Sequence, residues 1–160
     1  MKTIPLTRGY FAKVDDEDYM ELAKARWYAD IKGNGVYAKR RVSVDGRSRI
    51  VGMHRFLMGY PVGLQVDHIN GDTLDNRKSN LRVCTNSENS RNRNKSSSNK
   101  SGYKGVYWSK QKNKWSVEVI KDYKKHYGGS FDNLKDAVIS YNNLSAKLFG
   151  EFFRPNVYRE

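Results

Sequence analysis

The stretch between residues 66 and 89 most constrains the fold of this chain, because it alternates strand-like runs with strong turn signals. Residues 66–68 (Val-Asp-His) and 81–84 (Leu-Arg-Val-Cys) are short strand-like runs. Between them, Asn-Gly-Asp at 70–72 favours a turn, since Gly and Asn tolerate positive φ and Asp bonds to nearby backbone. The sequence therefore predicts two strands joined by a loop.

A helix is expected directly after the second strand. Thr85 is followed three residues later by Glu88, which is the pattern of a capping box. In this motif each of the two side chains satisfies a backbone N–H at the start of the helix. Asn89 then falls at the end of the first turn, and the predicted unit is strand, loop, strand and helix.

Three side chains of this unit offer the chemistry of metal-assisted hydrolysis. His68 is suited to act as a general base on water, because an unperturbed histidine has a pKa of about 6.5. Asp67 and Asn89 offer a carboxylate and an amide oxygen, which suit Mg²⁺ or Mn²⁺ completed by water and phosphate oxygens. We therefore expect one divalent ion per site at Asp67 and Asn89, with His68 as a catalytic residue.

The segment from about residue 54 to residue 94 resembles the HNH nuclease motif of phage-type homing endonucleases, which has the ββα-metal fold. The resemblance implies that His68 is the general base and that Asp67 and Asn89 are metal ligands. It also implies that Asn80 is the middle asparagine, which braces the loop behind His68. Many members carry histidine where this chain has Asn89, and an amide suits zinc or nickel less well than imidazole does.

The charge of the chain indicates a polyanionic partner. Its 160 residues include 30 Lys and Arg against 17 Asp and Glu, a formal net charge of +13, and the cations are spread along the whole sequence. This is expected of a protein that neutralises phosphates, and we expect double-stranded DNA as the partner. No apolar run approaches a membrane span and no signal peptide is evident, so we expect no membrane contact. The expected location is the cytoplasm, of a bacterial host if a phage encodes the protein.

The region before the motif reads as a β-rich extension. An acidic run at 15–18 lies where it would cap the start of a helix. Asp-Gly at 45–46 favours a hairpin turn. The strand-like runs are residues 9–14, 27–31, 36–40 and 48–51.

A polar, basic segment at 91–102 cannot bury a core and marks a boundary. We expect a nuclease domain at 1–94, a Ser/Asn-rich linker at 95–101 and a second domain at 102–160. The linker either follows the DNA backbone and orders on binding, or it is a plain flexible tether.

The second domain reads as a three-stranded sheet and one helix. The strand-like runs are 103–108, 114–120 and 126–131. Asp132 is the expected N-cap of the helix and Gly150 its C-terminal stop. One helix cannot cover both faces of a sheet, so one face is expected to be open to a DNA groove.

Residues 101–156 resemble the plant ethylene-response-factor (Apetala-type) DNA-binding domain. The matching residues are Tyr103-Lys104-Gly105-Val106, the runs 114–119 and 129–131, and the helix 134–150. The resemblance implies that the sheet reads the major groove, although Lys104 stands where the family has an arginine and cannot reproduce its bidentate contact with guanine. The expected DNA-binding residues are Arg91, Arg93, Lys95, Lys100, Lys104, Tyr107, Trp108 and Lys114.

These features together predict an α+β protein with an HNH core, the β-rich extension and the small C-terminal domain. The predicted function is a metal-dependent DNA endonuclease, of the homing type by resemblance, acting as a monomer or weak dimer. One active site per chain cuts one strand, so a monomer would nick and a dimer could break both strands. The alternative is a DNA-binding regulator that keeps the nuclease fold without its activity.

Overall fold

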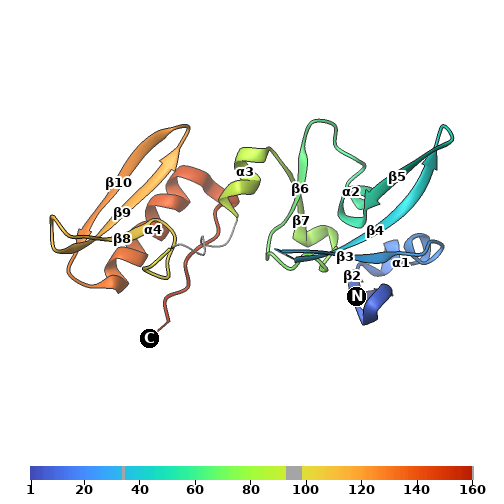
Figure 1. The fold of residues 1–160 in the computed structure, drawn as a ribbon, viewed down its shortest axis with the longest axis horizontal. Helices are drawn as coiled ribbons and strands as arrows, with labels where there is room; N and C mark the ends of the chain where they lie inside the picture. Colours follow the sequence, from blue (N-terminus) through green and yellow to red (C-terminus); the bar gives the residue numbers. More distant parts are fainter. Residues whose placement is uncertain (34, 93–98, 160) are drawn as a thin grey trace. The chain divides into compact units, whose positions relative to one another are not determined.

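The protein is described from a computed structural model. It describes residues 1–33, 35–92 and 99–159. The chain forms two compact units, Met1–Asn89 and Ser90–Glu160 (Figure 1). Each unit combines helices with antiparallel strands and has its own hydrophobic core, so the mixed α and β composition predicted from the sequence is present.

The elements of the first unit are short and follow one another closely. They are β1 (Lys2–Pro5), β2 (Phe11–Val14), α1 (Asp16–Ala23), β3 (Tyr28–Lys32), β4 (Gly35–Val44), β5 (Arg47–Gly52), α2 (Met53–Leu57), β6 (Gln65–His68), β7 (Leu81–Cys84) and α3 (Asn86–Arg91), whose last residues cross the boundary between the units. Two 3₁₀ turns, Thr7–Gly9 and Lys78–Asn80, lie among them.

The strands of the first unit form three small antiparallel sheets, β1-β2, β3-β4-β5 and β6-β7. The predicted hairpin turn between β4 and β5 is confirmed. Asp45 and Gly46 have φ angles of 50° and 71°, as the central residues of a type I′ turn require. Strand β1, which the sequence analysis does not predict, pairs with β2.

The core of the first unit lies around Trp27 and packs the extension against α2. The Trp27 ring meets the Phe56 ring edge-on with centroids 6.2 Å apart, and its Nε1 donates to the Leu22 carbonyl at 2.9 Å. Val14, Leu22 and Met53 are fully buried nearby. Burial of these side chains supplies the main drive for folding, at about 1.5–3 kcal/mol for each large apolar side chain.

The second unit contains β8 (Val106–Ser109), β9 (Lys114–Lys121), β10 (Lys124–Phe131) and α4 (Leu134–Phe149), followed by a 3₁₀ turn at Gly150–Phe152. The sheet order is β10-β9-β8, antiparallel, and α4 packs across one face (Figure 1). The predicted three strands and helix are thus present, with Gly150 as the C-cap at φ 56°.

Two sequence expectations for this unit are wrong. The N-cap of α4 is Asn133 rather than Asp132, because the Asn133 side chain accepts from the Asp136 N–H at 2.8 Å. The first strand begins at Val106, so Lys104 does not lie on it. The Lys104 ammonium instead donates to the Arg154 carbonyl at 2.7 Å, and burial lowers the pKa of Lys104 to about 8.

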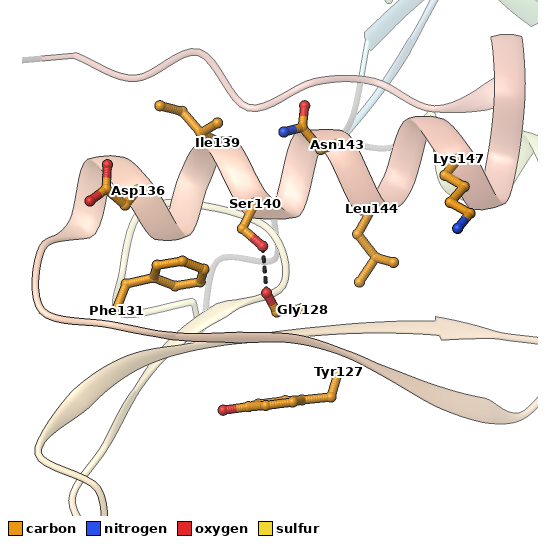
Figure 2. A pocket seen from close by; sticks show the side chains of 9 residues that line it. All are labelled: Tyr127, Gly128, Phe131, Asp136, Ile139, Ser140, Asn143, Leu144 and Lys147. Atoms are coloured by element: carbon orange, nitrogen blue, oxygen red, sulfur yellow. Dashed lines mark hydrogen bonds between the residues drawn. The ribbon is translucent and has the colours of Figure 1, made fainter.

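Helix α4 approaches the backbone of β10 closely. Ser140 Oγ donates to the Gly128 carbonyl at 2.6 Å (Figure 2). A Cβ atom at Gly128 would lie 2.6 Å from Val117 Cγ1 of β9 and 3.2 Å from Leu144 Cδ2 of α4, so glycine leaves room for both side chains over β10. Tyr127 lies on the opposite side of the sheet, away from α4 (Figure 2). The sheet therefore has one face covered by the helix and one that carries exposed side chains such as Tyr107 and Tyr127.

None of the helices in the described part of the chain has the length and apolar character needed to cross a membrane.

Candidate active site

The strand, loop, strand and helix predicted between residues 66 and 89 are present in the structure. Strands β6 and β7 pair antiparallel, with Gln65 opposite Cys84 and His68 opposite Leu81. The capping box is confirmed at the start of α3. The Thr85 N–H donates to Glu88 Oε2 at 2.8 Å, and the Glu88 N–H donates to Thr85 Oγ1 at 3.2 Å. This motif fixes where the helix begins relative to the end of β7.

Asn89 lies in the first turn of α3 and is half-buried. Its N–H donates to the Thr85 carbonyl at 3.0 Å, so its backbone is part of the helix that the capping box begins. The position of its side chain therefore depends on the register set by Thr85 and Glu88.

Asn80 joins the two ends of the loop that follows His68. Its Oδ1 accepts from the Asn70 N–H at 3.0 Å, and its Nδ2 donates to the Asp75 carbonyl at 2.8 Å. Its own carbonyl accepts from the Ile69 N–H at 2.9 Å. These bonds fix the backbone directly after His68, which is the bracing position that the resemblance implies for Asn80.

Asp75 is a second residue that holds the loop together through hydrogen bonds, and the sequence did not predict this role. Its carboxylate accepts from Arg77 Nε at 2.7 Å and from the Arg77 NH2 group at 2.6 Å, and also from Asn70 Nδ2 at 3.0 Å. The hydrogen bonds from Arg77 hold the pKa of Asp75 below its ordinary value. Asp75 is almost fully buried, so this bidentate pair keeps the loop compact.

The N-terminal extension supports the same loop along its other side. The Lys13 N–H donates to the Leu74 carbonyl and the Lys13 carbonyl accepts from the Asn76 N–H, both at 2.8 Å. Thr73 Oγ1 donates to the Val36 carbonyl at 2.7 Å and accepts from the Val36 N–H at 3.1 Å. Strands β2 and β4 are therefore part of the framework that positions the loop.

The acidic run lies at the start of α1 as predicted, with Asp15 at the N-cap position and the other carboxylates in the first turn, and it also contacts this loop. The Asp15 side chain makes no capping hydrogen bond. Its Oδ2 accepts instead from the Lys78 N–H at 2.7 Å, while the Lys78 ammonium contacts Asp18 at 2.7 Å and Glu17 at 3.0 Å. The acidic run therefore anchors the loop to α1.

Asp67, a predicted metal ligand, lies on β6 opposite Arg82 of β7. Its Oδ2 accepts from Arg82 Nε at 3.1 Å and from the Arg82 NH2 group at 2.8 Å. Both residues are buried, with 8 % and 9 % of their surfaces exposed. The pair fixes the carboxylate of Asp67, the residue that precedes the catalytic candidate His68 on β6.

His68 is buried at the end of β6, with 5 % of its surface exposed. Its Nε2 lies 3.3 Å from Asn76 Oδ1. The ring of His54 meets it edge-on at a centroid distance of 5.2 Å, and the ring of Tyr37 lies 6.4 Å away. Burial lowers the pKa of His68 below 6.5, against the opposing effects of the bond to Asn76 and the charge of Asp67. A neutral imidazole, the form that a general base needs, is therefore favoured at neutral pH.

His54 lies next to His68 in the structure, and the sequence did not predict this contact. It lies on α2, 14 positions before His68. Burial, followed by the proximity of His68, lowers the pKa of His54 to about 3. A cavity of about 410 Å³ opens beside it, lined by Lys32, Tyr37, Lys39, Ile50, Gly52, His54 and Arg55. The site thus has a cationic rim on the side of β4 and α2.

The shifted pKa of His54 predicts acid sensitivity. Between pH 6.5 and pH 3 the unfolded chain binds a proton at His54 that the folded chain does not, so stability falls as the pH falls. Relative to His54→Gln, the wild type should lose about 2 kcal/mol more unfolding free energy between pH 7 and pH 5. Urea denaturation of both proteins at each pH measures this difference. Equal losses in the two proteins would show that His54 does not carry this penalty.

Two of the predicted DNA-binding residues near the linker, Arg91 and Lys100, belong to the second unit. Arg91 ends α3, with its guanidinium 4.7 Å from the centre of the Phe149 ring. Lys100 is exposed in a turn. Arg93 and Lys95 lie outside the described residues, as does most of the predicted linker.

The other predicted DNA-binding residues belong to the sheet of the second unit. Tyr107 and Trp108 are both about half exposed on β8, and Trp108 contacts Trp115 edge-on at 5.2 Å. Lys114 begins β9 and pairs with Asp132 at 3.1 Å. Contrary to the expectation, Lys104 does not lie on this sheet, and its ammonium donates to the Arg154 carbonyl near the C-terminus.

Comparison with known proteins decides the family. An uncharacterized HNH endonuclease of Acanthamoeba polyphaga mimivirus is 31% identical over 156 residues, which cover 93% of this chain and 76% of that protein. The chain belongs to the HNH endonuclease family. A family model described as HNH endonuclease matches residues 58–91, which contain β6, β7 and α3. The alignment with the mimivirus HNH endonuclease covers 93% of this chain, so it includes most of the second unit as well as the first.

A second viral relative of this HNH endonuclease is Protein 3.8 of Escherichia phage T7. It is 37% identical over 94 residues, which cover 59% of this chain and 77% of the phage protein. No solved structure matches the chain. The relatives therefore support the nuclease assignment, and they give no support for an Apetala-type second domain.

Proposed function

We propose that this HNH endonuclease is metal-dependent and hydrolyses phosphodiester bonds of double-stranded DNA, with His68 as its general base. The observation that carries the proposal is the environment of His68. The ring is buried beside Asp67, at the start of a loop that Asn80 and Asp75 brace from within. The order of β6, loop, β7 and α3 supports a ββα-metal fold for this part of the chain.

The proposed metal ligands are the carboxylate of Asp67 and the amide oxygen of Asn89. These are hard oxygen donors, which fit Mg²⁺ or Mn²⁺ better than zinc. Among the described residues no group of three or more His, Cys, Asp or Glu side chains could hold an ion. A site completed by water and phosphate oxygens is consistent with this, and Mg²⁺ commonly retains such ligands.

In the proposed mechanism, His68 takes a proton from water as the water oxygen attacks phosphorus. The bond from phosphorus to the 3′ oxygen breaks in the same displacement. The bound ion would supply charge stabilisation to the phosphate oxygens and the leaving oxygen. The contribution of the protein is to keep His68 neutral and oriented.

The ligand assignment predicts a change in metal dependence for Asn89→Ala. We expect the metal concentration that gives half-maximal nicking to rise at least about tenfold, with partial rescue at high Mn²⁺. Nicking of supercoiled plasmid across a metal titration measures this. Asn86→Ala, on the same helix, is the matched control and should keep the wild-type profile. An unchanged profile for Asn89→Ala would remove Asn89 from the ligand set.

We also propose that the second unit binds DNA through the open face of its sheet, as the Apetala-like resemblance implies. The exposed Tyr107 and Tyr127 and the nearby Lys112 support this. The Lys104 ammonium is bonded to the Arg154 carbonyl and does not belong to the sheet. We therefore expect the contacts with DNA bases to come from the sheet face that carries Tyr107.

Removal of the second unit tests this assignment. A chain shortened to residues 1–94 should bind DNA more weakly, and the logarithm of its affinity should fall less steeply with the logarithm of salt concentration. The reason is that each lost phosphate contact reduces the slope by about 0.9. Fluorescence anisotropy with labelled duplex at several salt concentrations gives both values. Equal affinity and equal slope in the two proteins would rule out the second unit as a DNA-binding module.

The biological setting that we propose is that of a phage-type homing endonuclease, free-standing or associated with an intron. A catalytically inert DNA-binding regulator is the alternative. It predicts DNA binding without any metal-dependent strand cleavage.

A further inference from the structure

The sheet β3-β4-β5 has one face toward the core and one outer face. Residues opposite each other in an antiparallel pair share a face, and side chains alternate along each strand. Ala29 and Ala38 are such a pair, and both are buried in the core. The register therefore places the alternate residues on the other face, which we call the outer face. Its side chains are Tyr28, Asp30 and Lys32 of β3, Tyr37, Lys39, Arg41 and Ser43 of β4, and Ser48 and Ile50 of β5.

The outer face carries more positive than negative charge. Its cations are Lys32, Lys39 and Arg41, and among the described residues of the three strands Asp30 is the carboxylate that opposes them. Asp30 Oδ2 lies 2.6 Å from the Lys39 ammonium and 4.0 Å from that of Lys32. Arg41 is exposed and forms no ion pair within the part of the chain that the structure describes. The face therefore has positive charge left to attract a polyanion.

The outer face leads to the proposed active site through Tyr37. The centre of the Tyr37 ring lies 6.4 Å from that of His68 and 6.0 Å from that of His54. The cavity of about 410 Å³ beside His54 is also lined by Lys39 and Ile50, which both belong to the outer face. A DNA strand that lies along this face would therefore arrive at His68.

The spacing of the outer-face side chains suits a DNA backbone. Side chains on one face of a strand recur about every 6.6–6.8 Å, so Arg41 lies about 13 Å along β4 from Tyr37. One strand of B-DNA carries a phosphate about every 3.4 Å along the helix axis. The step from Tyr37 to Arg41 thus corresponds to about four phosphates, with Lys39 between them. Lys39 and Arg41 can therefore contact separate phosphates of one strand.

The opposite face of the same sheet offers a contrast. Near the core it is covered, because the Arg40 guanidinium lies 4.8 Å and 4.5 Å from the ring centres of Trp27 and Phe56. Toward the hairpin turn, Arg47 and Arg49 are exposed on this face. They carry the same charge as the outer-face cations, but their face leads to the core and not to the proposed active site.

We propose that the outer face is a second DNA-binding surface of this chain, in addition to the sheet of the second unit. Lys32, Lys39 and Arg41 hold phosphates next to the one that is cut. This inference rests on the proposed function, since the bound strand is the one on which His68 would act. The contacts are with phosphates, so they strengthen binding to all DNA sequences alike.

Two double variants of the full-length protein separate the two faces. Lys32→Gln with Arg41→Gln removes two cations from the outer face, and Arg47→Gln with Arg49→Gln removes two from the opposite face. All four side chains are exposed, so the folded structure should persist in both variants, which a thermal melt checks. Fluorescence anisotropy with labelled duplexes in EDTA, at several salt concentrations, measures binding without cleavage.

We expect the outer-face variant to bind every duplex more weakly than the wild type does. The slope of the logarithm of affinity against the logarithm of salt concentration should become shallower by about 1.8, because two phosphate contacts are lost at about 0.9 each. The opposite-face variant should keep the wild-type slope.

Wild-type affinity and slope in the outer-face variant would overturn the proposal. An equal loss in the opposite-face variant would also overturn it, because binding would then follow net charge and not the face. If the outer-face variant loses the expected slope but the wild type cuts no DNA with any metal ion, the proposed cleavage fails and the binding surface stands. If the wild type cuts DNA and both variants bind as it does, the surface fails and the proposed cleavage stands.

Discussion

Replacing His68 by alanine is expected to lower the rate of DNA nicking by a factor of about 10²–10⁴. The dissociation constant for DNA should change little, because in the proposed mechanism His68 acts in the chemical step and cationic side chains supply the phosphate contacts. The burial of His68 and the braced loop behind it are the structural basis of this expectation.

Single-turnover nicking and equilibrium binding on the same DNA measure the two effects separately. His126→Ala, in the second unit, is a matched control that removes a histidine far along the chain from the motif and should nick at the wild-type rate. A loss of binding as large as the loss of cutting would contradict the role of His68 as a base. So would a wild-type rate in His68→Ala.

The largest expected loss of stability comes from Arg82→Met. This change leaves the Asp67 carboxylate buried without the guanidinium that contacts it at 2.8 Å and 3.1 Å. Removing one partner of a buried ion pair costs about 3–5 kcal/mol, because the remaining charge keeps its desolvation penalty. Urea denaturation should therefore show an unfolding free energy lower by about that amount.

Two further variants make this test specific. Lys78→Met breaks a pair with Glu17 and Asp18 that is more exposed to solvent, and should cost about 1 kcal/mol or less. The double variant Asp67→Leu with Arg82→Met removes both buried charges and should recover stability without recovering nicking. A loss below about 1 kcal/mol in Arg82→Met would show that the pair contributes little to the fold. Recovery of nicking in the double variant would contradict a catalytic role for Asp67.

Local signals in the sequence predict the elements of the structure well. The capping box of Thr85 and Glu88, the Asp45-Gly46 turn and the Gly150 stop all involve contacts within a few residues. Such interactions depend on residue type and spacing, so a single sequence contains them. Predictions made from such signals are wrong by only a residue or so, as at α4, where Asn133 is the N-cap and not the neighbouring Asp132.

Contacts between distant residues account for what the sequence did not reveal. The Asp15 side chain bonds to Lys78, 63 positions away, and the rings of His54 and His68 meet across 14 positions. Which residues meet in this way depends on how the strands pack, and hydrophobic periodicity does not determine it. The wrong placement of Lys104 on a strand has the same origin. Its ammonium donates to the Arg154 carbonyl, which lies 50 positions later in the chain.

The most direct test of metal-dependent DNA cleavage is a plasmid assay with the full-length protein. Supercoiled plasmid is incubated with Mg²⁺ or Mn²⁺, with and without EDTA, beside His68→Ala. The proposed function predicts open-circle product with the metal ion, and none with EDTA or with the variant. Absence of open-circle product with every divalent metal tried, or equal cleavage in EDTA, would contradict it.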